Sequence, residues 1–225
     1  MITAVPADPM SQIKKMISHP DLSLETPLWQ AGLTVGGIDE AGRGAWAGPV
    51  AAGAVILPMQ ADILQTLSGV RDSKCMTPLQ RKKWAEQIKI TALGWAVGFA
   101  SSLEIDELGI VRATRMAMQR AVDALPAAPD HLLLDAVVLR EVEIPQTILF
   151  KGDAISISIS AASVLAKTHR DEGMIHYEQD FPGYGFAQHK GYGTRLHRAC
   201  LDRLGPCPIH RASFRPVRDW QQLPE

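Results

Sequence analysis

Apolar residues occur in short runs after residue 34, and several runs end at Gly, Pro or a charged residue. Runs of this length predict β-strands, and the β-branched, wholly apolar ones predict strands that are buried on both faces. The predicted strands cover residues 35–39, 52–57, 95–101, 131–139 and 146–150.

Helical patterns separate several of these runs. A helix is predicted over residues 78–90, because Thr77 supplies an N-cap and Pro78 suits the first helical position. Residues 108–125 have apolar positions three or four apart and stop before a proline, which predicts a second helix. Ser160 is expected to cap a third helix over residues 161–181. This order of strands and helices predicts a mixed α/β fold.

The chain divides into a long middle part with two short ends. Four prolines interrupt residues 1–34, so we expect a partly ordered preamble there, with a short helix over 11–18. Residues 35–218 are predicted to form one folded domain, and residues 219–225 a C-terminal tail.

Composition favours a globular protein in a reducing compartment. Of the 225 residues, 46% are hydrophobic and 21% charged, and the formal net charge is −1, so any binding to nucleic acid must be local. The three cysteines, Cys75, Cys200 and Cys207, are too few for a disulfide framework. Neither a secretory signal nor an apolar run of membrane-spanning length is seen, so we expect a soluble, cytoplasmic protein.

Acidic residues lie within or just after three predicted strands. Asp39 and Glu40 follow the first, Asp135 lies within the fourth, and Asp153 comes just after the fifth. A single acid in such a place is more often a helix cap or a salt-bridge partner. Several carboxylates gathered at one site repel each other, and a hard divalent cation such as Mg²⁺ or Mn²⁺ is the usual compensation. Two such ions can hydrolyse a phosphodiester.

Three further segments suggest binding to phosphate or nucleotide. Gly42-Arg43-Gly44 combines close backbone approach with a guanidinium, although such a triplet is usually only a turn. Asp72-Ser73-Lys74 precedes a predicted helix and is equally well explained as an ordinary lead-in. Residues 184–193 interleave aromatic residues, glycines and Lys190, as in surfaces that stack on bases, or form a structured loop with aromatic plugs.

The C-terminal region is locally basic. Between residues 186 and 218, seven lysines and arginines face a single acid, Asp202, which gives this stretch a charge of +6 on a nearly neutral chain. Basic stretches are usually solvated surface, but this one directly follows the aromatic segment and could neutralise phosphates. Cys200, Cys207, His197 and His210 lack the usual spacing of a zinc site, so surface or packing roles are favoured.

The chain resembles bacterial ribonuclease HII over residues 35–218. The resemblance is carried, in order, by GIDEAGRG (37–44), DSK (72–74), LLLDA (132–136), KGD (151–153), ISAASVLAKTHRD (159–171), FPGYGFAQHKGYGT (181–194) and HRASFRPV (210–217). It implies a ribonuclease H-like fold, in which a mixed central sheet is flanked by helices and followed by a C-terminal helical part. It also makes residues 35–218 the catalytic domain.

The resemblance implies an endoribonuclease. Such an enzyme cuts the RNA strand of RNA–DNA hybrids and nicks 5′ of single ribonucleotides in DNA, leaving 3′-hydroxyl and 5′-phosphate ends, with two Mn²⁺ or Mg²⁺ ions. It assigns the metal and catalytic carboxylates to Asp39, Glu40, Asp135 and Asp153. It makes Gly42, Arg43 and Gly44 the sensors of the 2′-hydroxyl, and Tyr192 the aromatic residue at the RNA–DNA junction. Ser73, Lys74 and Lys190 are the further substrate contacts that we expect.

Two positions depart from the family pattern. Ala136 stands where glycine is usual, and Cys75-Met76 follows the DSK segment where another lysine is usual. Neither change removes a carboxylate. The preamble is too short for the N-terminal substrate-binding domain of the sister family, ribonuclease HIII.

Two other functions remain open. One is an inactive module that grips hybrids without cutting, and the other is a different metal-dependent nuclease on the same fold. We expect a monomer with no membrane association. The segment Gln221-Gln222-Leu223 is a candidate for docking to the replication sliding clamp.

Overall fold

A five-stranded mixed sheet forms the centre of the computed structural model, which describes residues 19–60 and 62–221. The strand order is β3-β2-β1-β4-β5. β1 pairs antiparallel with β2 and parallel with β4, and β5 continues the sheet parallel to β4. The bounds are β1 Val35–Ala41, β2 Val50–Ile56, β3 Gly94–Ala100, β4 His131–Asp135 and β5 Gln146–Leu149.

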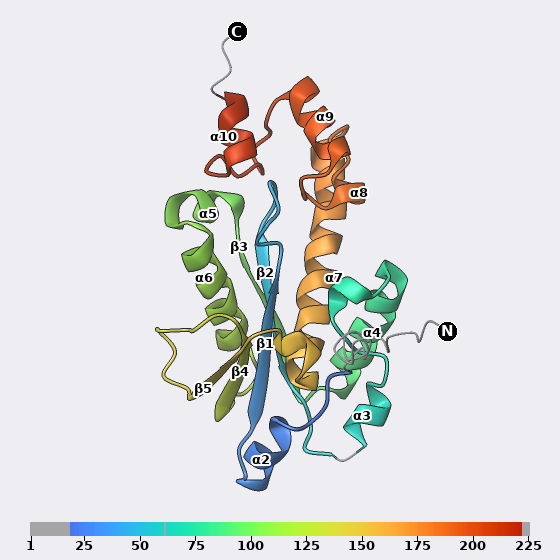
Figure 1. Cartoon of the computed structure of the whole chain (residues 1–225), viewed down its shortest axis with the longest axis vertical. Helices are drawn as coiled ribbons and strands as arrows, with labels where there is room; N and C mark the ends of the chain where they lie inside the picture. Colours follow the sequence, from blue (N-terminus) through green and yellow to red (C-terminus); the bar gives the residue numbers. More distant parts are fainter. Residues whose placement is uncertain (1–18, 61, 222–225) are drawn as a thin grey trace, which may run out of the picture.

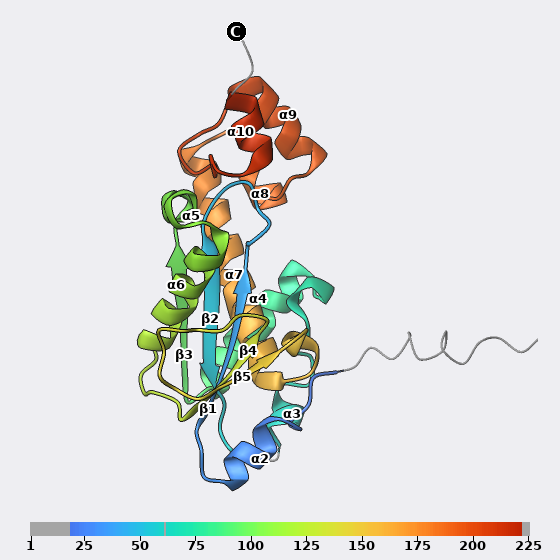
Figure 2. The same cartoon turned by 60° about the vertical axis from the view of Figure 1, so that its left-hand side comes forward.

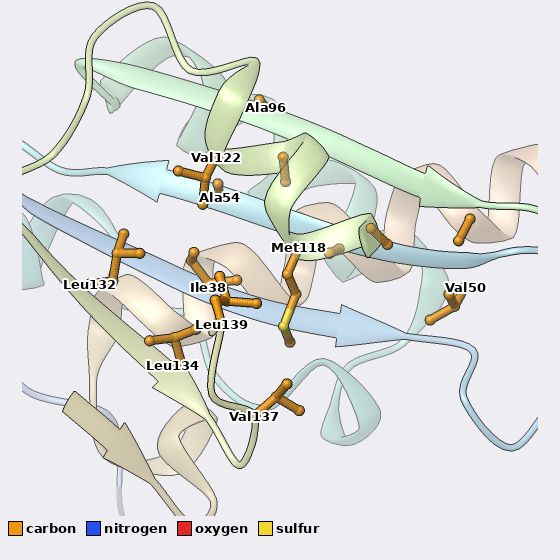
Figure 3. Packing of buried hydrophobic residues seen from close by; sticks show 14 of the residues in the cluster. Ile38, Val50, Ala54, Ala96, Met118, Val122, Leu132, Leu134, Val137 and Leu139 are labelled. Atoms are coloured by element: carbon orange, nitrogen blue, oxygen red, sulfur yellow. The ribbon is translucent and has the colours of Figure 1, made fainter. Parts of the chain in front are cut away.

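Helices cover both faces of the sheet (Figure 1). α5 (Ser102–Leu108) and α6 (Ile110–Asp123) lie on one face. α7 (Ile157–Asp180) and α4 (Pro78–Thr91) lie on the other, with the short α3 (Ile63–Thr66) nearby. Side chains on alternate strand positions pack into a separate core on each face. Figure 3 shows the α6 side, where Ile38 and Leu134 meet Met118.

α7 lies unusually close to the sheet because two glycines face it. A Cβ built on Gly37 would lie 2.2 Å from the backbone carbon of Ser158, and one on Gly53 would lie 2.3 Å from the carbonyl oxygen of Ala162. The helix backbone therefore rests directly on the backbones of β1 and β2. This contact fixes the distance between α7 and the sheet.

The C-terminal helices extend beyond one end of the sheet (Figures 1 and 2). α8 (Phe186–His189), α9 (Arg195–Leu204) and α10 (Arg215–Gln221) follow α7 there. Their small core joins aromatic and apolar residues from α7 and the C-terminal region to Ala47, from the loop between β1 and β2. The predicted α/β fold with a C-terminal helical part is confirmed.

Several local boundaries differ from the sequence-based prediction, three of them for identifiable reasons. α7 begins four residues early, because Ser156 and not Ser160 caps it by accepting a hydrogen bond from the Ile159 amide. The predicted helix over 108–125 is α6, which begins at Ile110, because Gly109 adopts a left-handed φ of 76° and separates it from α5, a helix that was not predicted. The predicted strand 131–139 ends at Asp135.

Part of the preamble packs on the domain. α2 (Glu25–Gln30) carries the fully buried Glu25, whose Oε1 accepts hydrogen bonds from the Ser156 hydroxyl and the Ser158 amide. Glu25 thus caps the N-terminus of α7, where a carboxylate is favourable. The helix predicted over 11–18 lies outside the described residues. None of the helices in the described part has the length and apolar character that a membrane crossing requires.

The Gly37 contact predicts a large and specific effect on stability. Gly37→Ala should lower the free energy of unfolding by about 3 kcal/mol, because backbone of α7 would have to move. Gly173→Ala is the control, since a Cβ there meets nothing within 4 Å and alanine favours the helix. Urea unfolding of both variants measures the difference. Equal stabilities would contradict the close packing of α7.

Candidate active site

The two central carboxylates meet because β1 and β4 are parallel neighbours. Ile38 pairs with Leu134, so the next residues, Asp39 and Asp135, lie side by side where these strands approach their carboxyl ends. Asp39 is almost fully buried, with 3% of its surface exposed, and its Oδ1 accepts the Glu40 amide at 2.8 Å. Asp135 is half-buried and its Oδ1 accepts the amide of Gly152 at 2.9 Å.

The other two acids have basic partners. Glu40 Oε1 lies 3.2 Å from Nη1 of Arg43. Asp153 lies on the 3-10 turn η2 (Gly152–Ala154), and its Oδ2 is 3.3 Å from Nζ of Lys74. Lys74 belongs to a second 3-10 turn, η1 (Ser73–Cys75).

Burial and mutual repulsion raise the pKa values of three of these carboxyls. Burial raises the pKa of Asp39 well above its usual value, and the charges of Glu40 and Asp135 raise it further. Burial also raises the pKa of Glu40, although Arg43 opposes the shift, and that of Asp153, although Lys74 opposes it. Burial would lower the pKa of Lys74, but nearby aspartates, first Asp153, outweigh it and raise that pKa. The site therefore has an excess of negative charge and favours a cation.

The donor atoms fit a hard divalent cation. Asp39 Oδ2 and Glu40 Oε2 are buried and accept no hydrogen bond, so both have lone pairs free for a ligand. Carboxylate oxygens are the donors that Mg²⁺ and Mn²⁺ prefer. Within the described residues, no three His, Cys, Asp or Glu side chains are gathered closely enough to hold an ion as they stand. Binding by all the carboxylates therefore requires some of these side chains to change rotamer.

A loop fixed by two buried arginines borders the carboxylates. We refer to residues 42–49 as the recognition loop. Nη1 of Arg211 donates to the Arg43 carbonyl, and Nε of Arg170 donates to the Pro49 carbonyl, at 2.9 and 2.8 Å. Gly42 has a φ of 96°, and a Cβ there would lie 1.9 Å from Arg170 Nε, so both its conformation and its surroundings require glycine.

Tyr192 lies beside two cations from α7. Lys167 Nζ is 4.9 Å and the Arg170 guanidinium carbon 5.2 Å from the centre of its ring. Nη1 of Arg170 also donates to the Lys190 carbonyl at 2.9 Å. Arg170 thus contacts both the recognition loop and the segment that carries Tyr192.

Most of the predicted residues line a single cleft of about 440 Å³. The cleft is lined by Asp39, Glu40, Ala41, Gly42, Arg43, Gly44, Ser73, Lys74, Arg81, Asp135, Lys167 and Tyr192. Asp153 is not in its lining but reaches the site through Lys74.

Two of the predicted substrate contacts, Lys190 and Ser73, form hydrogen bonds with other groups of the protein. Lys190 lines a different hollow, beside Arg81 and Asp171, and its ammonium donates to the Ala187 carbonyl. The Ser73 hydroxyl is buried against that of Ser163 at 2.9 Å.

Arg81 and Lys167 are cleft residues that the sequence analysis missed. Arg81 Nη2 and Lys167 Nζ contact the two oxygens of Asp171 at 3.0 and 2.7 Å. Arg81 also holds η1 in place, since its Nη1 donates to the carbonyls of Ser73 and Met76. The only indication in the sequence that Lys167 is functional was its place in a segment that carries the family resemblance. Nothing in the sequence indicated a role for Arg81, because an arginine on a helix is usually solvated.

Comparison with known proteins identifies the family. The family model described as Ribonuclease HII matches residues 36–217. A curated Ribonuclease HII from Synechococcus sp. is 51% identical over 206 residues, which are 91% of this chain and 92% of the relative. The chain belongs to the ribonuclease HII family. The ribonuclease H-like fold and the ribonuclease class predicted from the sequence are thereby confirmed.

Solved structures of related ribonucleases share the fold. The crystal structure of ribonuclease H2 from Pyrococcus horikoshii has a TM-score of 0.72 and 25% identity, and covers 84% of this chain and 97% of that one. The crystal structure of Bst-RNase HIII in complex with Mn²⁺ has a TM-score of 0.68 and 18% identity, and covers 84% and 69%. The latter similarity extends to the fold alone.

Ala136 is strained in this ribonuclease HII chain. It follows Asp135 at the end of β4 and has a φ of 53°, in the left-handed region where a Cβ is unfavourable. Its amide donates to the Leu149 carbonyl at 2.8 Å, which ties the turn to β5. The resemblance placed a glycine here, and the backbone explains why.

Restoring glycine should therefore stabilise the protein. Ala136→Gly is expected to raise the free energy of unfolding by about 1 kcal/mol. Ala124→Gly is the control, because Ala124 is also exposed but has a φ of −87°, and it should lose stability instead. Chemical denaturation measures both changes. A loss of stability in Ala136→Gly would refute the strain.

In the metal-free protein at neutral pH, the ionised carboxylate of Asp39 should lower the free energy of unfolding. A carboxyl with a raised pKa in the folded state favours folding when protonated, so its contribution is lost as pH rises through that pKa. Asp39→Asn should therefore unfold at a higher temperature than the unsubstituted protein at pH 7 in EDTA. The gain should shrink as the pH falls towards 4. Thermal unfolding at several pH values checks this, and a gain independent of pH would count against it.

Proposed function

We propose that the chain is a metal-dependent endoribonuclease that cuts the RNA strand of RNA–DNA hybrids and nicks 5′ of single ribonucleotides in DNA. Its products would carry 3′-hydroxyl and 5′-phosphate ends. The observation that carries the proposal is the shared cleft, which places Asp39, Glu40 and Asp135 beside the recognition loop and Tyr192. Membership of the ribonuclease HII family supports the reaction class.

The carboxylates would hold two divalent cations, Mn²⁺ or Mg²⁺. Asp39 and Asp135 are the central ligands because they lie on neighbouring strands, and Glu40 and Asp153 complete the set. When bound, such ions activate a water and stabilise the leaving 3′-oxygen. The unpartnered oxygens of Asp39 and Glu40 support this assignment.

The recognition loop would select the ribonucleotide. Gly44 is exposed and a Cβ on it would meet nothing within 4 Å, so the backbone of the Gly-Arg-Gly triplet is open to a substrate. The 2′-hydroxyl is the group that distinguishes RNA from DNA at a given site, and backbone groups can hydrogen-bond to it. In this scheme the 2′-hydroxyl is recognised and is not the nucleophile.

Tyr192 would pack on the nucleotide at the RNA–DNA junction. Lys167 and Arg170 support its ring, and Lys167 also lines the cleft, where a substrate phosphate would lie. Lys74 is the other cleft ammonium; its side chain is 72% exposed, so it can reach a phosphate. The roles of Ser73 and Lys190 stay predictions, as does clamp docking, whose segment extends outside the described residues.

The direct test is cleavage of an end-labelled DNA duplex with one embedded ribonucleotide. A nick just 5′ of the ribonucleotide is expected with Mn²⁺ or Mg²⁺, and none with EDTA or in an all-DNA duplex. Binding without cleavage would favour the inactive module. Equal cutting of the all-DNA control would favour another nuclease on the same fold.

Two substitutions separate catalysis from recognition. Asp135→Asn should lower kcat by about 10³-fold or more, because a central ligand is lost, while the fold is kept. Tyr192→Ala should weaken cleavage at an embedded ribonucleotide more than cleavage of a continuous hybrid. Steady-state kinetics on both substrates, with circular dichroism as the folding control, measures this. Full activity of Asp135→Asn would show that the metal site is misassigned.

A further inference from the structure

Three buried histidines lie next to the segment that carries Tyr192 and take no part in the chemistry proposed above. His189, His197 and His210 are at most 7% exposed. The rings of His189 and His197 stack with their centres 4.2 Å apart and an angle of 10° between the planes. Among the described residues, no acidic side chain contacts a ring nitrogen of these histidines. Their hydrogen bonds must therefore offset the free-energy cost of burying polar rings.

His197 and His210 form a hydrogen-bonded chain that ends on Tyr192. The Cys207 amide donates to Nδ1 of His210 at 2.9 Å, and the thiol and carbonyl oxygen of Cys207 lie farther from this nitrogen, at 3.2 and 3.3 Å. Nε2 of His210 lies 3.1 Å from Nε2 of His197, and Nδ1 of His197 lies 3.0 Å from the Tyr192 carbonyl oxygen. We refer to this sequence of contacts as the histidine relay.

The direction of the relay follows from its two ends. A carbonyl oxygen can only accept, so the His197 proton is on Nδ1 and its Nε2 is an acceptor. The shortest contact of His210 Nδ1 is the Cys207 amide, which can only donate, so this Nδ1 carries no proton and Nε2 of His210 donates to His197. Both ends require the same pair of neutral tautomers. An extra proton on either ring would remove an acceptor that the relay needs.

The relay also joins Tyr192 to the recognition loop. His210 forms an isolated β-bridge with Ala47, and the next residue, Arg211, donates its amide to the Trp46 carbonyl. The Trp46 amide in turn donates to the Gly191 carbonyl at 2.8 Å. The loop and the Tyr192 segment are therefore connected through backbone groups on one side and through His210 and His197 on the other.

We propose that His197 and His210 are positioning residues that fix the backbone of Tyr192 relative to the recognition loop and so set the preference for embedded ribonucleotides. The proposal rests on the proposed function, since it needs Tyr192 at the junction. Neither histidine contacts the substrate. Their loss should change the choice between substrates more than the chemistry itself.

Burial is consistent with neutral rings. Burial, with a smaller contribution from the neighbouring His189, lowers the pKa of both His197 and His210 to about 4. Both histidines are therefore neutral at pH 7, in the state that the relay requires.

Nuclear magnetic resonance of ¹⁵N-labelled protein tests the geometry without any activity measurement. At pH 7 the ring-nitrogen spectrum should show His197 protonated at Nδ1 and His210 at Nε2. His189 should also be protonated at Nε2, since its Nδ1 accepts the Gly191 amide. A His197 ring protonated at Nε2 would overturn the relay.

A pair of substitutions at His197 tests its role. His197→Asn can keep a donor near the position of Nδ1, whereas His197→Leu removes it. His197→Leu should lower the ratio of kcat/KM for an embedded ribonucleotide to that for a continuous hybrid by about tenfold, the scale of one lost hydrogen bond. His197→Asn should recover most of the ratio. Equal losses on both substrates in both variants would indicate a merely structural role.

The same change in the Tyr192→Ala background completes the test. If His197 acts through Tyr192, His197→Leu should no longer alter the substrate ratio there. An undiminished effect would overturn the proposal. If His197→Leu does not fold, His197→Asn and the tautomer spectrum still decide. Failure of the unsubstituted protein to nick the embedded ribonucleotide would instead refute the proposed function, while the spectrum would still report on the relay.

Discussion

The close contact between α7 and the sheet is the constraint on which the site depends. Gly37 and Gly53 let the helix backbone rest on β1 and β2, and any side chain at these positions would lift it. Successive turns of α7 then supply groups along the cleft. Ser163 lies against Ser73, Lys167 and Arg170 support Tyr192, and Asp171 binds Arg81. A small displacement of one helix would therefore disturb the carboxylates and the recognition residues together.

Two buried arginines, rather than regular secondary structure, hold the recognition loop in position. Arg170 and Arg211 are fully buried and donate to backbone carbonyls, and burial lowers the pKa of Arg211 to about 9. Removing either guanidinium would leave buried carbonyls unpaired, which is costly. The loop is thus rigid where its backbone faces the cleft. Such preorganisation is consistent with the binding role proposed for this loop.

Charge is distributed unequally across the site. Asp39 forms no salt bridge among the described residues, while Glu40 and Asp153 are each paired with a cation from a neighbouring turn. The central carboxylates therefore contribute negative charge that a divalent ion can neutralise. Arg43 and Lys74 moderate the repulsion without removing it. The same excess of charge explains how one site can favour metal binding and oppose stability.

The sequence by itself indicated the five strands, the three long helices and the acidic residues that share the cleft. Apolar runs located the strands, and the acids at their ends identified the carboxylate site, because buried carboxylates need compensation. It misplaced the start of α7, since Ser156 and Ser160 are equally good caps by local rules. Only the tertiary structure decided which cap Glu25 would assist, that Gly109 would separate α5 from α6, and that Arg81 and Lys167 would enter the cleft. It alone joined His197 and His210 behind Tyr192. These outcomes depend on contacts between residues far apart in the chain, and neither periodicity nor local propensity encodes such contacts.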